Sequence, residues 1–308
     1  MPYAVKRIQK IKDGERKLVH YTSAANAIKI INSGEIWMRN SMCMADFSEV
    51  QHGHDNLIDF FTDDGRKQRF FDALNNCHDG VAQEAIKLFD DHWNSISTNT
   101  FITCVSEHDP ISEDAHGRLS MWRAFGKGEV GVAFVLNTEA FLSESDVLKA
   151  YSSPVSYLTR GEFGDAMQSV IAGIERGQEF LKCTPRDQIL SFTFNMLLFA
   201  TTCSKHPGFL EEQEWRIIHL PDQHPSTVLK KSIETVGGIP QIVYKIPLQD
   251  IPDQGFVGAE IPKLVNKVII GPSEFDVAVY SALELALGAN GVENPGSVIG
   301  FSSIPLRG

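Results

Sequence analysis

Several scarcities narrow the classes of protein to which this chain of 308 residues can belong. Its five cysteines are odd in number and widely spaced and form no C-x-x-C pair, so we predict neither a disulfide framework nor a cysteine zinc site. The most apolar stretch, residues 192–200, is far shorter than the roughly 20 residues that cross a bilayer. The first twenty residues are basic and lack a signal-peptide core. We therefore expect a reduced, cytoplasmic protein with no membrane partner.

Positive charge is also scarce. The chain has 28 Lys and Arg against 39 Asp and Glu, which gives a net charge of −11. Broad binding to nucleic acid or to anionic membrane needs clustered positive charge, so the composition argues against both, although a local basic groove stays open. The apolar fraction of 43% is typical of a soluble globular protein and provides a sizeable core.

Common catalytic signatures are missing as well. The glycines at positions 126, 128 and 131 form neither a G-x-x-x-x-G-K-S/T loop nor a G-x-G-x-x-G helix opening. No G-x-S-x-G and no convincing Cys/His pairing is found. These absences argue against P-loop, dinucleotide-fingerprint and serine hydrolase chemistry.

The first structured unit is predicted to run strand, helix, glycine turn, strand. A strand at residues 17–21 precedes a helix that Thr22 or Ser23 can cap. Gly34 suits the position after the helix, where a positive φ is favourable for glycine, and a second strand follows at 35–39. The helix itself is indicated by apolar residues at helical spacing, namely Ala24, Ala27, Ile28 and Ile31.

The rest of the chain mixes strands and helices without strict alternation, which predicts an α+β fold with a mixed or antiparallel sheet. The strand at 129–136 is apolar on both faces and should lie centrally. We expect one domain over residues 1–308, with a helical insertion at about 40–100, a helical segment at about 160–203 and a loosely held N-terminal arm. Other elements are expected at residues 101–106, 212–220, 241–247, 267–271 and 297–303 (strands) and 273–288 (helix).

Three short motifs are candidates for a binding or catalytic site. His20, Tyr21 and Thr22 lie at the end of the first predicted strand, where the His20 imidazole can meet a ligand or can be a core histidine bonded to backbone. Ser120 and Trp122 precede the central strand, so Trp122 can wall a pocket for a flat ring or belong to the core. Glu212 and Glu214 would point to one face of a strand, roughly 7 Å apart, and can act on a ribose. Alternatively, Glu214 pairs with Arg216 at a solvated strand start.

His52 and His54 are a further candidate, for a metal site, since alternate residues of a strand share a face. No third cluster at a suitable spacing supports it. A polar loop is the simpler interpretation, and no metal is predicted.

Taken together, the motifs resemble a bacterial family known as domain of unknown function 2971. The resemblance covers about residues 17–275. After the second strand this sequence has Asp46 and Glu49 but lacks the Asn and Pro of the family's Phe-Asn-Asp-Pro-x-Glu element. The motifs that carry the resemblance are residues 18–23 with Gly34, 106–107, 120–122, 131–134, 212–217 and 268–272.

The order of these motifs is in turn similar to the ADP-ribosyltransferase superfamily. That resemblance implies split mixed or antiparallel sheets with helical insertions, and NAD as co-substrate. Glu214 would stabilise an oxocarbenium-like ribose, Glu212 would orient the acceptor, and His20 would contact the ribose and the nicotinamide amide. The remaining NAD-binding residues implied are Tyr21, Thr22, Arg39, Ser120 and Trp122.

The function expected from this resemblance is ADP-ribosyl transfer, of a toxin or phage-defence type. A protein side chain, a nucleic acid base, a small molecule and water all fit as acceptor. The alternative is a non-catalytic nucleotide-binding, ligand-binding or interaction protein that keeps the fold.

Overall fold

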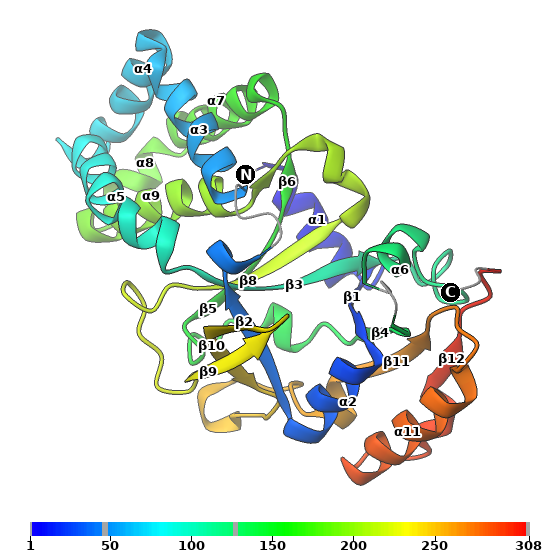
Figure 1. Cartoon of the computed structure of the whole chain (residues 1–308). Helices are drawn as coiled ribbons and strands as arrows, with labels where there is room; N and C mark the ends of the chain where they lie inside the picture. Colours follow the sequence, from blue (N-terminus) through cyan, green and yellow to red (C-terminus); the bar gives the residue numbers. More distant parts are fainter. Residues whose placement is uncertain (1, 45–48, 126–128, 306–308) are drawn as a thin grey trace. The chain divides into compact units, whose positions relative to one another are not determined.

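A ten-stranded mixed sheet and a group of helices make up the chain, in a computed structural model that describes residues 2–44, 49–125 and 129–305 (Figure 1). Contacts within the chain divide it into two compact units. Unit 1 comprises Met1–Arg7, Asn40–Thr100 and Ser153–Leu210, and unit 2 comprises Ile8–Arg39, Phe101–Ser152 and Glu211–Gly308. The predicted insertion and the predicted helical segment therefore come together as unit 1.

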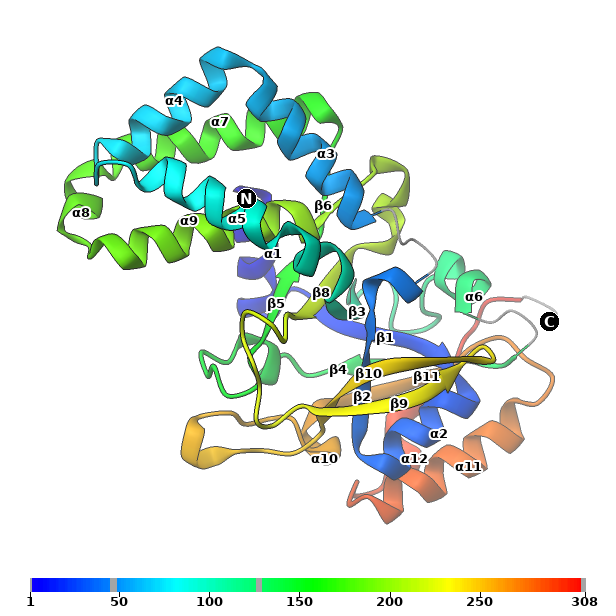
Figure 2. The ribbon, with the colours of Figure 1, turned by 60° about the vertical axis from the view of Figure 1, so that its left-hand side comes forward.

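Unit 1 is mainly helical. Helix α9 packs against both α3 and α5, and α4 packs against α5 and α7, as the ribbon in Figure 2 shows. The insertion was predicted to hold one clear helix, whereas it forms three. The elements of unit 1 are η1 (Ser41–Cys43), α3 (Glu49–Thr62), α4 (Asp64–Asn75), α5 (Val81–Thr98), β6 (Ser156–Tyr157), α7 (Arg160–Arg176), α8 (Gln178–Cys183), α9 (Arg186–Thr202), β7 (Ser204–Lys205) and, at the end of the unit, η3 (Pro207–Glu212).

Helices α3 and α9 of unit 1 approach each other closely at Gly53. A Cβ built on Gly53 would lie 2.0 Å from the carbonyl oxygen of Thr201, so only glycine lets the two backbones meet. Aromatic rings fill the space beside this contact: His54 stacks on Trp93 with ring centroids 3.5 Å apart. Helices α3 and α5 of the insertion thus pack on each other and on α9, which comes from a distant part of the sequence.

Unit 2 contains the sheet, in the order β12-β11-β4-β1-β3-β2-β10-β9, with β8 paired to β3 and β5 paired to β8. Strands β11 and β12 run parallel, and the other registered pairs of this sheet are antiparallel. The α+β class with a mixed, mostly antiparallel sheet is confirmed. The strands are β1 (Lys17–Ser23), β2 (Glu35–Asn40), β3 (Phe101–His108), β4 (Gly131–Leu136), β5 (Ala150–Pro154), β8 (Glu214–His219), β9 (Lys230–Val236), β10 (Ile239–Pro247), β11 (Val265–Ile270) and β12 (Ile299–Phe301).

The central position predicted for the apolar strand is correct, because β4 lies between β1 and β11 and all six of its residues are buried. One face, with Phe134 and Val268, is packed by α2 and α11. The other face, with Ala133 and Ile269, is packed by α6. The remaining elements are α1 (Pro2–Lys12), α2 (Ala24–Ser33), α6 (Leu119–Phe125), η2 (Ala140–Leu142), η4 (Pro252–Gln254), α10 (Ile261–Leu264), α11 (Asp276–Ala289) and α12 (Pro295–Val298).

The opening strand, helix and turn form as predicted. Ser23 caps α2 by accepting a hydrogen bond from the Asn26 amide, and Gly34 ends it at φ +61° with its N–H bonded to the Ile30 carbonyl. The N-terminal arm, in contrast, is not loose: it forms α1, and Ile11 is buried in the core of unit 2. Strand β9 escaped prediction because its residues are mostly polar and exposed, as suits an edge strand.

Candidate functional site

Strands β1 and β3 separate at His20. Their registered pairing covers only Lys17 to Val19 of β1, with Val19 opposite Ser106. Beyond that point β1 stays with β4 up to Ser23, while β3 continues beside β8. The sheet therefore forks on the β3 side of His20, and the His20 side chain lies at the fork.

The His20 imidazole is held by the fork itself. Its Nδ1 lies 3.0 Å from the carbonyl oxygen of Cys104. A carbonyl only accepts hydrogen bonds, so Nδ1 carries the hydrogen and donates it. Burial lowers the pKa of His20, which outweighs the opposite effect of that carbonyl. The ring is therefore neutral near pH 7, and its Nε2 is a hydrogen-bond acceptor.

Cys104 connects His20 to the predicted catalytic glutamate. While its carbonyl accepts from His20, its thiol donates to Oε1 of Glu214 over 2.8 Å. Glu214 is the first residue of β8 and lies opposite Ser106 of β3. His20 and Glu214 thus contact the same residue, His20 through the Cys104 carbonyl and Glu214 through the Cys104 thiol. Sequence reasoning missed Cys104, because nothing in its neighbours distinguishes it from a core cysteine.

Glu214 also pairs with Arg216. The Arg216 Nε donates to Glu214 Oε1 over 2.9 Å, and both side chains are buried, with 1% of Arg216 and 7% of Glu214 exposed. The expected alternative, a pair between these two residues, is therefore present. The pair is buried, whereas the sequence suggested a solvated pair at the surface. Removing one partner of a buried pair lowers the free energy of unfolding far more than removing one partner of a surface pair.

Glu212 does not lie where the sequence predicted. The strand begins at Glu214, and Glu212 is the last residue of the 3-10 helix η3. Between them, Gln213 adopts φ +44°, a left-handed conformation that breaks the two-residue alternation. The prediction that both glutamates share one strand face is wrong for this reason.

Tyr21 and Thr22 are both buried within β1. The Tyr21 hydroxyl accepts a hydrogen bond from the Arg118 amide at 2.8 Å, and burial raises the pKa of Tyr21 to about 12. Tyr21 belongs to the core cluster beneath α6, on the opposite side of β1 from His20. Thr22 shares the His20 side of the strand.

Trp122 is a core residue in this structure. Its indole N–H donates to the His116 carbonyl at 2.7 Å, and its ring packs edge-on against Tyr21. A Cβ built on Gly117, Gly131 or Gly271 would come within 3 Å of the ring. The tryptophan is thus enclosed by glycines, which is the core alternative weighed from the sequence. Ser120 is half-buried beside it on α6.

Arg39 lies near the end of β2 and donates from Nε to the Gln241 side chain of β10 at 3.1 Å. This contact ties β2 to β10 and is separate from the link between His20 and Glu214. Asp46 lies outside the described residues. Glu49 is the first residue of α3.

His52 and His54 lie on helix α3 rather than in a loop or strand. His54 stacks on Trp93, and Asn56 contacts Nε2 of His52 at 3.2 Å. Residues two apart on a helix point in different directions, so the shared face that a metal site would need does not form. Within the described ranges, no group of three His, Cys, Asp or Glu side chains is placed to hold a metal ion.

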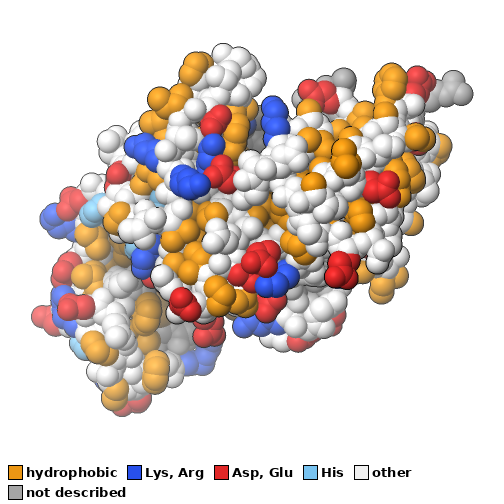
Figure 3. Space-filling model, turned by 90° about the horizontal axis from the view of Figure 1, so that it is seen from below, with side chains coloured by type: hydrophobic (Ala, Val, Ile, Leu, Met, Phe, Trp, Pro, Cys, Tyr) orange, Lys and Arg blue, Asp and Glu red, His pale blue; other side chains and the backbone are white. Residues whose placement is uncertain are grey.

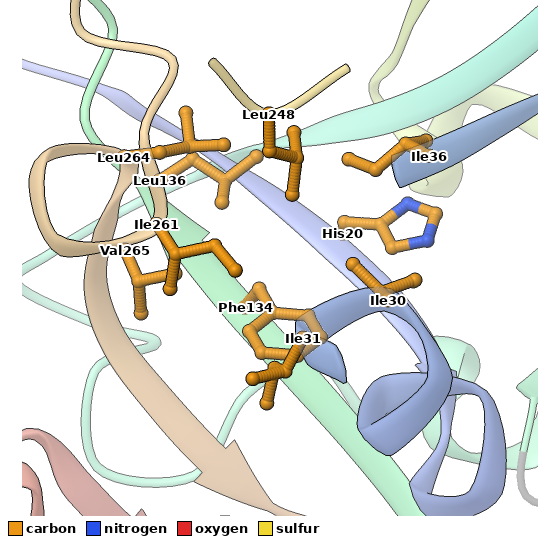
Figure 4. A pocket seen from close by; sticks show the side chains of 10 residues that line it. All are labelled: His20, Ile30, Ile31, Ile36, Phe134, Leu136, Leu248, Ile261, Leu264 and Val265. Carbon is orange, nitrogen blue, oxygen red and sulfur yellow. The ribbon is translucent and has the colours of Figure 1, made fainter. Parts of the chain in front are cut away.

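A small pocket lies next to His20 on the face covered by α2 (Figure 4). In that view the imidazole lies between Ile30 and Ile36, with both nitrogens turned away from Leu264 and Val265 at the far end. The cavity measures about 20 Å³, close to the space of one water molecule. Its walls apart from His20 are apolar, so it is a packing gap and not a nicotinamide pocket.

The surface drawn in Figure 3 carries acidic and basic side chains interspersed with apolar ones. This part of the described surface offers no extended basic area of the kind that nucleic acid binding requires. Among the described residues, no helix combines the length and the apolar character needed to span a membrane.

Comparison with known proteins gives one match. Residues 121–217 match the family model of a protein of unknown function (DUF2971). The resemblance to that family is confirmed over these residues, and over the rest of residues 17–275 it stays a prediction. The matched segment begins in α6, includes β4, β5 and residues 153–210 of unit 1, and ends in β8. It contains Trp122, Glu212 and Glu214. No curated protein and no solved structure matches the chain.

Proposed function

We propose that the chain binds NAD and transfers its ADP-ribosyl group to an acceptor. One observation carries the proposal: His20 and Glu214, far apart in sequence, meet across Cys104 at the fork of the sheet. The neutral His20 ring has an accepting nitrogen, and the Glu214 carboxylate is an anionic acceptor that already accepts from Cys104 and Arg216. Ribose hydroxyls and the nicotinamide amide are hydrogen-bond donors, so this set of groups suits them.

In the proposed reaction, the bond between C1′ of the ribose and the nicotinamide nitrogen breaks. Nicotinamide leaves with the electron pair, and positive charge develops on the ribose. A fixed carboxylate in a largely dry site stabilises that charge as it appears, which is the part assigned to Glu214. The acceptor supplies the electron pair of the new bond to C1′ and loses its proton to water. Glu212, next to the strand on η3, orients the acceptor.

A non-catalytic ligand-binding protein is the second candidate, and the Glu214–Arg216 pair favours it. A carboxylate already bonded to a buried guanidinium has part of its charge balanced, which reduces its effect on a developing cation. In that case the fork binds a nucleotide without cleaving it.

Incubating the purified chain with NAD and measuring free nicotinamide distinguishes the two. Transferase activity gives nicotinamide with wild type and at least about 100-fold less with Glu214→Gln, the scale of lost transition-state electrostatics. Binding without cleavage gives a higher melting temperature in NAD and no nicotinamide.

Two histidine variants test whether a rise in melting temperature in NAD comes from binding at the fork. A ligand at a hundred times its dissociation constant adds about 2.7 kcal/mol when only the folded state binds it. His20→Ala should reduce the shift, whereas His224→Ala, a histidine of unit 2 outside the fork, should leave it unchanged. If millimolar NAD gives neither a shift nor nicotinamide with folded wild type, the proposal is wrong.

A further inference from the structure

We infer that Arg118 is a positioning residue that sets the turn at residues 211–213 and through it places Glu212 and Glu214. Its catalytic consequence rests on the function proposed above. Neither composition nor motif pointed to this arginine. The inference comes from the acceptors that its guanidinium N–H groups reach.

The Arg118 guanidinium donates to three backbone carbonyls that surround the start of β8. Nη1 donates to the carbonyls of Glu211 at 2.8 Å and Glu212 at 3.1 Å, and Nη2 donates to that of Glu107 at 2.7 Å. The third carbonyl of the turn, that of Gln213, accepts from the Glu107 amide at 2.9 Å. Two of the three carbonyls of the turn therefore accept from Arg118. The third accepts from Glu107 of β3, whose own carbonyl accepts from Arg118.

Glu113 in turn orients the Arg118 guanidinium. Its Nε donates to Glu113 Oε1 at 2.9 Å, and the other oxygen of Glu113 accepts from the Asp109 amide at 3.0 Å. The Arg118 backbone amide donates to the Tyr21 hydroxyl, one residue after His20. Arg118 thus connects β1, β3 and the turn before β8, and only 13% of its side chain is exposed.

The turn needs such support because Gln213 is held at φ +44°. A left-handed conformation in a residue other than glycine costs of order 1–3 kcal/mol and persists only where its surroundings enforce it. This one residue decides that Glu212 leaves the strand and that Glu214 begins it. A planar guanidinium reaches several carbonyls at fixed angles, whereas a lysine ammonium is a single flexible point of charge.

The test is Arg118→Lys, with Arg123→Lys as the matched control on an exposed arginine of α6. Glu211 and Gln213 are exposed, so water can solvate carbonyls that lose the guanidinium, and we expect the variant to fold. Hydrogen exchange in a peptide covering residues 207–216 should be at least about tenfold faster in Arg118→Lys and unchanged in Arg123→Lys. This measurement needs no NAD.

Kinetics then test the catalytic part. A displacement of about 1 Å at a reacting group costs up to about 100-fold, so kcat for nicotinamide release should fall tenfold to 100-fold while KM for NAD changes little. Gln213→Pro is an independent second variant. Proline fixes φ near −65°, so the turn cannot form and kcat should fall likewise without any change at Arg118.

The outcomes separate the two proposals. Unchanged exchange in Arg118→Lys overturns the positioning role, and so does faster exchange with an unaltered kcat. Wild type that releases no nicotinamide removes the proposed function, while the exchange result still decides whether Arg118 sets the turn.

Discussion

Replacing Gly53 by alanine tests the close approach of α3 and α9 that builds unit 1. The new Cβ would lie 2.0 Å from the Thr201 carbonyl oxygen, 2.7 Å from its carbonyl carbon and 2.9 Å from its Cα. All three atoms are backbone, so no side chain can turn aside and the helices must separate. Overpacking of this kind costs about 3 kcal/mol, the upper end of its usual range.

Alanine recovers about 1 kcal/mol of that loss through its higher helix propensity, which leaves a net loss of about 2 kcal/mol. At about 2–4 °C for each kcal/mol, the melting temperature should fall by about 4–8 °C. Gly173→Ala is the matched control, because Gly173 also lies within a helix of unit 1 and its Cβ would meet only Arg176 at 4.0 Å. That variant should gain up to about 1 kcal/mol.

Differential scanning calorimetry of both variants measures the effect, and circular dichroism confirms that helix content is retained. Opposite signs for the two glycines are the expected result. A Gly53→Ala protein that melts at or above the wild-type temperature would refute the reasoning, because α3 and α9 could not then be as close as the structure has them.

Three further predictions concern pH, the insertion and the two glutamates. Burial lowers the pKa of His54, whose Nδ1 is buried without a partner in the structure, so the folded state binds fewer protons than the unfolded one. The folded state therefore keeps its full stability above pH 6.5 and loses part of it as the pH falls below 6.5. Between pH 7 and 5 the melting temperature should drop less in His54→Phe than in wild type. Equal drops in the two proteins would contradict the prediction. Residues 40–100 expressed alone should show no cooperative melt by circular dichroism, because α3 and α5 pack against the absent α9; a cooperative transition would refute it. Glu212→Gln should reduce transfer to the acceptor while leaving NAD hydrolysis largely intact, whereas Glu214→Gln should suppress both in assays of nicotinamide release; equal effects would argue against separate roles.

The sequence by itself determined the elements whose cause is local. The helix cap at Ser23, the glycine at Gly34 and the apolar run of β4 each depend on residues within a few positions, and each is found as predicted. The fold class followed because the irregular alternation of strands and helices already excludes a regular parallel α/β sheet. The sequence places His20 near the end of its strand, whereas β1 runs on to Ser23 and His20 lies in its middle, where only the pairing with β3 ends.

The contacts that these elements make with distant parts of the chain were decided only by the tertiary structure. The apolar run after Gln213 predicts a strand that includes Glu212, and alternation then places Glu212 and Glu214 on one face. The conformation of Gln213 that breaks this pattern is supported by Arg118, 95 residues earlier in the chain. The carbonyl that His20 contacts belongs to Cys104, 84 residues away in the sequence. Gly271, one of the three glycines that enclose Trp122, is also remote in sequence. Periodicity reports which side chains share a face, but a hydrogen bond between distant segments depends on how the whole chain packs, and the candidate site is made of such bonds.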